Sequence, residues 1–186
     1  MLNTTIKGID LIFNTSRKVF SPKVIDEGTL AMLSEIDFES GDKVLDLGCG
    51  YGVVGILVAK LIGAENVIMV DIDQESVNLA KENAKLNGVS DITIYKSDGF
   101  NDFKEMNFTK IISNPPYHVD FSTPKYFIEK GFNRITMNGK MYMVTKREKW
   151  YKNKLISVFG GVKIVRKDDY FVFMSIKKSF KYSNKK

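Results

Sequence analysis

Residues 44–52 read VLDLGCGYG, a short apolar run that contains Asp46 and leads into three glycines at alternate positions. The next nine residues, Val53–Leu61, have the spacing of a helix. Glycines allow positive φ angles and let a ligand approach the backbone closely. In a doubly wound sheet, such a turn lies at the carboxyl edge of the strands, where ligands bind. The stretch therefore predicts a strand, a ligand-binding loop and a helix.

On both sides of this unit, short apolar runs alternate with segments of helical spacing. Strands are predicted over Lys43–Leu47, Asn66–Val70, Ile92–Lys96, Lys110–Ser113, Lys140–Thr145, Val162–Arg166 and Tyr170–Ile176. Further helices are predicted over Gln74–Asn87, Pro124–Arg134 and Glu148–Phe159. Such alternation implies parallel strands joined by right-handed crossovers, with the last two runs pairing as an antiparallel hairpin. The predicted fold class is α/β, a three-layer, doubly wound, mostly parallel seven-stranded sheet that ends in an antiparallel hairpin.

The N-terminal segment and the helix near Pro124 give further predictions about the fold. Leu2–Phe13 alternates loosely and predicts a strand or hairpin, and Pro22–Ile36 predicts a helix packed on the sheet. Thr123 is expected to cap the helix that has Pro124 in its first turn. The 186 residues fit one domain, with an N-terminal segment over 1–37, a core over 38–178 and a basic tail over 179–186.

Composition narrows the class of protein. Hydrophobic residues make up 44% and charged residues 27%, which argues against long disordered regions and coiled coils. The single cysteine fits a reducing compartment, no apolar run reaches membrane-spanning length, and residues 1–10 lack a signal-peptide pattern. The sequence thus predicts a soluble cytoplasmic protein.

The net charge of +6 is unevenly distributed. Residues 1–139 carry 14 Lys and Arg against 19 Asp and Glu, a net of −5, whereas residues 140–186 carry 14 against 3, a net of +11. Such a split is typical of a surface for a polyanion or of a solvated lysine-rich tail. Lys146, Arg147 and Lys149 follow the fifth strand and are the best candidates for phosphate contacts, while the lysines after Ile176 fit a mobile tail.

Two ligands compete for the glycine loop. Gly50-x-Gly52-x-x-Gly55 also fits the dinucleotide pattern of an NAD-dependent oxidoreductase, with Asp71 on a ribose. A pyrophosphate, however, needs N–H donors and a positive helix end, and Asp46 would repel it. S-adenosylmethionine carries an ammonium and a sulfonium and no phosphate, so an acid beside Gly48, Gly50 and Gly52 favours it as the cofactor.

Acids also follow the second and third strands. Asp71 is placed to accept both ribose hydroxyls, and Ile72 would pack on the adenine face. Asp73 is expected to cap the following helix. Asp98, followed by Gly99, could accept a hydrogen bond from the adenine amino group or simply form a turn. Because consecutive parallel strands end at one edge, these acids should surround one ligand.

The fourth strand ends in Asn114-Pro115-Pro116-Tyr117. Two prolines remove two donors and push the preceding residues to extended conformations, which predicts a rigid loop that exposes carbonyl acceptors. The Asn114 side-chain oxygen and the Pro115 carbonyl would take the two hydrogens of a planar NH2 group and aim its lone pair at the methyl donor. Tyr117 would stack on the ring, as for a flipped or unpaired base.

Two further reactive side chains have less specific roles. His118 could contact the substrate or accept a proton, or serve as a structural hydrogen-bonding group. Cys49 has no basic partner in the sequence and is interpreted as a small packing residue. No cluster of His, Cys or carboxylates has the spacing of metal ligands, so no metal is expected.

Asp46–Gly52, Asp71, Asp98 and Asn114–Tyr117, in this order, resemble a class I S-adenosylmethionine-dependent methyltransferase with its Rossmann-like fold. More narrowly, the chain from about Val19 to Lys177 resembles the small-subunit ribosomal RNA guanine-N2 methyltransferases and their single-domain relatives. The narrower likeness rests on Val19-Phe20-Ser21, Asp26-x-Gly28-Thr29, His118, Val144-Thr145-Lys146-Arg147 and Trp150-Tyr151. The resemblance implies methylation of a guanine exocyclic amine, with ribosomal RNA or a ribosomal subunit as partner.

Other readings remain open. The Asn-Pro-Pro-Tyr motif is shared with enzymes that methylate a glutamine amide of a translation release factor. A DNA amine methyltransferase would need a target-recognition region, for which 186 residues leave little room. An RNA-binding module with an inactive methyltransferase fold is opposed by the intact Asp46, Asp71 and Asn114. A lysine-rich surface favours a monomer.

Overall fold

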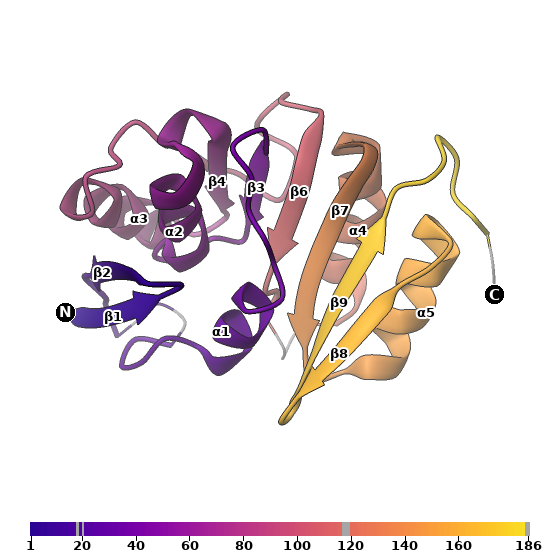
Figure 1. Cartoon of the computed structure of the whole chain (residues 1–186), viewed down its shortest axis with the longest axis horizontal. Helices are drawn as coiled ribbons and strands as arrows, with labels where there is room; N and C mark the ends of the chain where they lie inside the picture. The colour runs from indigo at the N-terminus through magenta and orange to yellow at the C-terminus, as the bar shows by residue number, and fades with distance from the viewer. Residues whose placement is uncertain (18, 20, 117–119, 185–186) are drawn as a thin grey trace.

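The computed structural model describes residues 1–17, 19, 21–116 and 120–184. Its centre is a seven-stranded sheet in the order β5-β4-β3-β6-β7-β9-β8 (Figure 1). Strands β5, β4, β3, β6 and β7 pair in parallel, and β9 lies antiparallel between β7 and β8, so six of the seven strands share one direction. The predicted α/β fold with a terminal antiparallel hairpin is confirmed. The strands are β3 (Val44–Leu47), β4 (Val67–Asp71), β5 (Thr93–Lys96), β6 (Phe108–Ser113), β7 (Ile135–Thr145), β8 (Lys163–Lys167) and β9 (Tyr170–Ile176).

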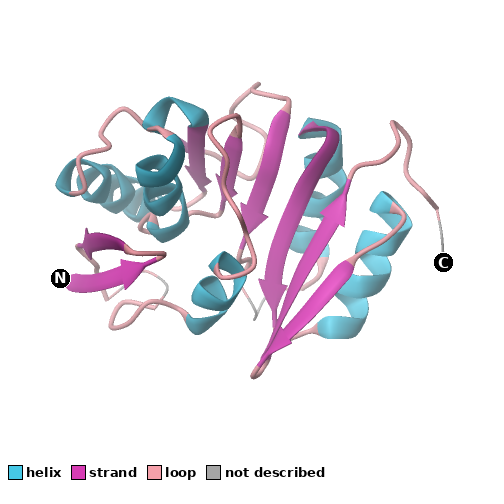
Figure 2. Cartoon of the chain, viewed as in Figure 1, coloured by secondary structure: helices cyan, strands magenta, loops and turns pink. Residues whose placement is uncertain are grey.

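Helices cover both faces of the sheet (Figure 2). The central strands are buried on both sides, and their side chains alternate between two cores. Val44 and Met69 belong to one core, and Leu45 and Val70 to the other. The first core is completed by α1 (Glu27–Leu33), α2 (Val53–Ile62) and α3 (Gln74–Leu86), and the second by α4 (Ser122–Arg134) and α5 (Glu148–Phe159). Among the described residues, no helix has both the length and the apolar character needed to cross a membrane.

Most element boundaries lie within two residues of the prediction, and two expectations were wrong. The helix predicted over Pro22–Ile36 is only α1, because the Asp26 side chain caps it by accepting from the backbone N–H of Thr29 at 2.8 Å. Thr123 does not cap α4, which begins at Ser122, where Asp120 accepts from the backbone N–H at 2.9 Å. Strand β7 begins five residues earlier than predicted, since it follows α4 directly.

The N-terminal segment forms a separate hairpin of β1 (Leu2–Ile6) and β2 (Ile9–Phe13). Asn83 of α3 and Asn87, the C-cap of that helix, hold the hairpin through hydrogen bonds to its backbone. Asn87 pairs with the N–H and carbonyl of Ile12, and Asn83 pairs with those of Asn14 while also donating to the Tyr51 carbonyl at 2.8 Å. The residues after the hairpin are thereby brought beside the glycine loop.

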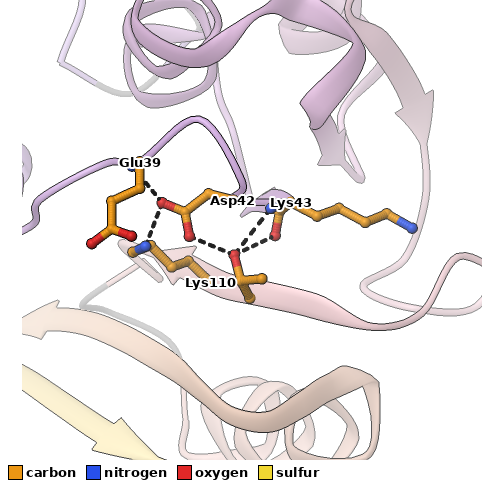
Figure 3. Close-up of polar contacts among 5 residues, drawn as sticks. Glu39, Asp42, Lys43 and Lys110 are labelled. Carbon is orange, nitrogen blue, oxygen red and sulfur yellow. Dashed lines mark hydrogen bonds and ion pairs between the residues drawn. The ribbon is translucent and has the colours of Figure 1, made fainter.

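The amino edge of the sheet carries a buried polar cluster (Figure 3). Lys110 of β6 forms an ion pair with Asp42, and both side chains are about 8% exposed. Asp42 also accepts from the Thr109 hydroxyl at 2.7 Å and from the Glu39 backbone N–H at 2.8 Å. Lys43 donates its backbone N–H to the same Thr109 hydroxyl at 3.0 Å, so the cluster ties the start of β3 to β6.

Candidate active site

A cavity of about 410 Å³ opens at the carboxyl edge of the parallel strands. This volume lies within the range of small-molecule sites. Its walls come from the ends of β3, β4 and β6, the loop after β5, and the segment that leads into α1. The sequence-predicted residues that line it are Asp46, Gly48, Gly50, Asp71, Ile72, Asp98, Gly99, Asn114, Pro115 and Pro116. Chain segments that are distant in sequence thus meet at one cavity, as expected for a doubly wound sheet.

The backbone N–H groups of the glycine loop donate hydrogen bonds within the protein. Gly48 and Cys49 both donate to the Val70 carbonyl at 2.9 Å, and Gly50 donates to the Asp71 carboxylate at 2.8 Å. Gly48 and Gly50 have φ angles of 80° and 54°, which L side chains rarely adopt. These three N–H groups are thus already bonded within the protein. In the first turn of α2, the Gly55 N–H is bonded to Asp46 at 2.9 Å, and this carboxylate at the helix N-terminus argues against a pyrophosphate there.

Gly52 has a packing role instead. It does not line the cavity, and a Cβ there would lie 2.9 Å from both Ile56 and Met69. Gly55 is still tighter, because its Cβ would lie 2.4 Å from Met69. The two glycines let α2 pack closely on β4, which explains why a dinucleotide-like spacing occurs without a dinucleotide site.

Asp46 is a buried carboxylate at the floor of the cavity. Its residue is 3% exposed, and one oxygen accepts from the Gly55 backbone N–H at 2.9 Å. Burial, and secondarily the charge of Asp71, raises the pKa of Asp46 to about 7. No lysine or arginine in the described part of the chain forms an ion pair with it. The carboxylate is therefore suited to a cationic ligand.

Asp71 is held in a fixed orientation. One oxygen accepts from Gly50 at 2.8 Å and the other from the Asp73 backbone N–H at 2.9 Å. Burial raises the pKa of Asp71, although these two bonds oppose the shift. Each carboxylate oxygen has a second lone pair for a ligand hydroxyl. Asp73 caps α3 as predicted, accepting from Ser76 at 2.8 Å.

The remaining predicted cofactor contacts differ in exposure. Ile72 lines the cavity with 63% of its surface exposed, so a ligand ring could cover an apolar side chain there. Asp98 is exposed at the cavity rim. Gly99 has a φ angle of 58°, and a Cβ at this position would lie 2.5 Å from the Tyr126 ring. The glycine thus lets the loop after β5 pass close to α4.

Asn114 follows β6, whose last residue, Ser113, donates its hydroxyl to the Leu47 carbonyl at 2.7 Å. The Asn114 side-chain nitrogen donates to Asp26 Oδ1 at 2.7 Å and to Thr29 Oγ1 at 2.9 Å. Sequence reasoning assigned no site role to Asp26 and Thr29. Their spacing signals a helix cap, but a partner 85 or more residues away could not be inferred from it. Tyr117 and His118 lie outside the described residues.

Lys146, Arg147 and Lys149 lie beyond the cavity rather than in its wall. All three are exposed. Lys146 and Arg147 follow β7, and Lys149 lies in the first turn of α5, at the same sheet edge that carries Asn114. Lys146 lies 4.7 Å above the Tyr170 ring, and Arg147 lies 5.2 Å above the Phe121 ring. The cations thus lie over aromatic side chains outside the cavity.

The described residues give little support to a cysteine nucleophile or a metal site. Burial, with the nearby Asp46 and Asp71, raises the pKa of the Cys49 thiol well above its usual range, which agrees with a packing role and not with a nucleophile. Within residues 1–17, 19, 21–116 and 120–184, no group of His, Cys, Asp and Glu could hold a metal ion.

Comparisons with known proteins agree with the fold. The Bacillus subtilis protein YbxB, called uncharacterized, is 28% identical over 93% of this chain and 89% of its own length. Ribosomal RNA small subunit methyltransferase C of Haemophilus influenzae (strain PittGG) is 32% identical over 86% of this chain, which spans only about half (49%) of that relative.

A solved structure of the T. thermophilus 16S rRNA N2 G1207 methyltransferase (RsmC), in complex with AdoMet and guanosine, superimposes with a TM-score of 0.83. It is 24% identical, and the match covers 95% of this chain and 50% of that one. A Pyrococcus furiosus methyltransferase superimposes with a TM-score of 0.74 at 16% identity, covering 91% of this chain and 90% of that one. The model of the methyltransferase small domain family matches residues 10–175, and the chain belongs to this family.

Proposed function

We propose that this protein is an S-adenosylmethionine-dependent N-methyltransferase whose acceptor is an exocyclic amine of a nucleic-acid base, specifically guanine N2 in ribosomal RNA. The observation that carries the proposal is a single cavity that joins a buried carboxylate, Asp46, to the Asn114-Pro115-Pro116 loop. The first suits a cationic methyl donor, and the second suits a planar amine. Membership of the methyltransferase small domain family supports the same reading.

The residues around the cavity fit the cofactor. Asp46 has the charge for the ammonium and sulfonium end, Asp71 has two oxygens for a ribose diol, and Ile72 offers an apolar surface to the adenine. Gly48 and Gly50 leave the loop without side chains, and a Cβ at either position would meet nothing within 4 Å. When bound, S-adenosylmethionine supplies an electrophilic methyl group.

The chain's own contribution to catalysis is positioning and electrostatics. The Asn114 side-chain oxygen and the Pro115 carbonyl would accept the two hydrogens of the acceptor NH2. Held this way, the nitrogen lone pair is turned out of conjugation with the ring and toward the methyl group. As the N–C bond forms, the bond between the methyl carbon and sulfur would break and leave a neutral thioether. The nitrogen would then carry one extra proton, which leaves to solvent. Tyr117 is proposed to stack on the base.

The RNA acceptor is supported by the names of relatives and by charge. Several relatives that are 29–32% identical are ribosomal RNA small subunit methyltransferases C. Lys146, Arg147 and Lys149 are proposed to contact phosphates beside the flipped base. Replacing all three by Gln should lower RNA affinity and make it less dependent on salt concentration, because each lost phosphate contact removes counterion release. An unchanged salt slope in filter binding would contradict these contacts.

The decisive experiment is transfer of labelled methyl groups from S-adenosylmethionine to naked ribosomal RNA, ribosomal subunits, DNA and a translation release factor, followed by nucleoside and amino-acid analysis. We expect label in N2-methylguanosine from RNA or from the small subunit. Label found only in the release factor would show that the methyl acceptor is a glutamine amide and not a nucleic-acid base. The Asn114→Ala variant serves as control, since it should keep cofactor affinity in calorimetry while losing methyl transfer.

A further inference from the structure

Asn114 is joined to α1 by a compact polar cluster. Its side-chain nitrogen donates to both Asp26 and Thr29, at 2.7 and 2.9 Å. Asp26 Oδ1 also accepts from the Thr29 backbone N–H at 2.8 Å and from the Thr29 hydroxyl at 3.3 Å. Thr29 is 8% exposed, and Asp26 and Thr29 both line the cavity. One carboxylate oxygen therefore both caps a helix and holds an amide of the proposed active site.

The geometry fixes which way the Asn114 amide points. An asparagine amide has a donor NH2 at one end and an acceptor oxygen at the other. If the amide were flipped, its oxygen would face the Asp26 carboxylate and the Thr29 hydroxyl oxygen. The contact with Asp26 would be repulsive, and one or both of the hydrogen bonds that Asn114 donates would be lost. The observed orientation sends the NH2 to α1 and turns Oδ1 away from these two side chains.

We propose that Asp26 and Thr29 are positioning residues that orient Asn114 Oδ1 as the acceptor for the substrate amine. This inference rests on the proposed function, since an acceptor amine is what Asn114 would hold. It adds a role for the segment before the sheet, because α1 then completes the site as well as packing on the core. A misplaced acceptor would slow the chemical step more than it weakens cofactor binding.

Substitutions at Thr29 separate this role from simple folding. Thr29→Val keeps the shape and the helix position but removes the hydroxyl acceptor, whereas Thr29→Ser keeps the hydroxyl. We expect Thr29→Val to lower kcat about tenfold and Asp26→Ala about a hundredfold, with S-adenosylmethionine affinity changed less than about threefold. Thr29→Ser should restore kcat to within about threefold of wild type. Rescue by serine is an outcome that a purely structural role for Thr29 does not predict.

A matched control lies at the other end of the same helix. Ser34 is the C-cap of α1, where its hydroxyl donates to the Ala31 carbonyl at 2.7 Å, and it lies outside the cavity wall. Ser34→Ala should lower stability slightly and leave kcat unchanged. If kcat fell equally in Ser34→Ala and Thr29→Val, helix integrity would explain the loss and the inference would be overturned.

A second readout needs no activity. The Asn114 side-chain amide protons, identified by nuclear magnetic resonance from their absence in Asn114→Ala, should exchange with solvent about tenfold faster in Thr29→Val than in wild type, while Ser34→Ala leaves them unchanged. Equal exchange in wild type and Thr29→Val would overturn the anchoring. So would a Thr29→Val variant that loses only cofactor affinity. A wild-type protein that methylates no acceptor, with the exchange difference intact, would instead contradict the proposed function.

Discussion

Two buried aspartates, four positions apart at either end of β3, have opposite electrostatic environments. Asp42 is 7% exposed and forms an ion pair with Lys110. Asp46 is 3% exposed, and the one hydrogen bond that it accepts within the described residues comes from the Gly55 backbone N–H at 2.9 Å. Burial raises the pKa of both carboxyls, but the hydrogen bonds and charge of Lys110, Glu39 and Thr109 outweigh it at Asp42 and lower its pKa. At Asp46 burial dominates and the pKa rises to about 7.

The difference contrasts a structural edge of the sheet with the edge that we propose to be functional. At the amino edge, the fold itself supplies the cation for Asp42 (Figure 3). At the carboxyl edge, Asp46 is buried beside a cavity without a lysine or arginine partner among the described residues, and we propose that a cationic ligand neutralises it. A buried carboxylate without a cation lowers stability when it is ionised, and groups with such a perturbed pKa are common at active sites. Four measurements test this contrast.

The largest effect is expected from Asp42→Asn, which leaves the buried Lys110 ammonium without its anion. Breaking a buried ion pair in this way costs about 3–5 kcal/mol of unfolding free energy, measurable by urea denaturation. The double variant Asp42→Asn with Lys110→Met removes both charges and should recover much of the loss. Cofactor affinity of the folded protein should stay unchanged. A loss below about 1 kcal/mol would mean that the pair is not structural.

The second effect concerns binding at the other end of the strand. Asp46→Asn keeps an oxygen for the Gly55 N–H but removes the charge that we assign to the cationic end of the cofactor. We expect S-adenosylmethionine affinity in calorimetry to fall about a hundredfold, or about 2.7 kcal/mol. Asp42→Asn, measured beside it, should bind as wild type. Equal affinity in wild type and Asp46→Asn would remove the functional half of the contrast.

These roles explain which parts of the molecule could be predicted. The strand-loop-helix at residues 44–62 and the acids at strand ends follow from local pattern, because a parallel sheet brings its carboxyl ends together whatever the side chains do. The cavity-lining positions of Asp46, Asp71 and Asn114 follow from the same rule.

Contacts between distant segments could not be predicted. The pairing of Lys110 with Asp42 and the hold of Asp26 and Thr29 on Asn114 join residues 68 to 88 positions apart. Nothing in the local sequence specifies such a partner. The helix predicted over Pro22–Ile36 was wrong for a different, local reason. The Asp26 side chain caps α1 by accepting from the Thr29 backbone N–H, so the helix begins only after Asp26.

The third measurement compares the stabilities of the ligand-free proteins. The Asp46 pKa rises from about 3.8 when unfolded to about 7 when folded, so its stabilising contribution is present at low pH and is lost as pH rises toward 7. At pH 8, Asp46→Asn should therefore be more stable than wild type by about 4 kcal/mol, with the difference vanishing near pH 4. Asp42→Asn should show the opposite sign at pH 8. A destabilised Asp46→Asn protein at pH 8 would show that the carboxylate is satisfied within the fold.

The fourth and smallest effect is the pH dependence of cofactor affinity. Only the ionised form of Asp46 attracts the cationic end, and the ionised fraction falls from about one half at pH 7 to a few per cent at pH 5.5. Affinity should therefore drop about tenfold over this range in wild type. Protonation of the cofactor's own amino group works in the opposite direction and is nearly complete below pH 7. Asp71, whose pKa is also raised, contributes in the same direction as Asp46. The variant Asp46→Asn separates these contributions. The pH dependence that it retains belongs to Asp71 and to the cofactor's amino group, and the part that it loses measures the charge of Asp46.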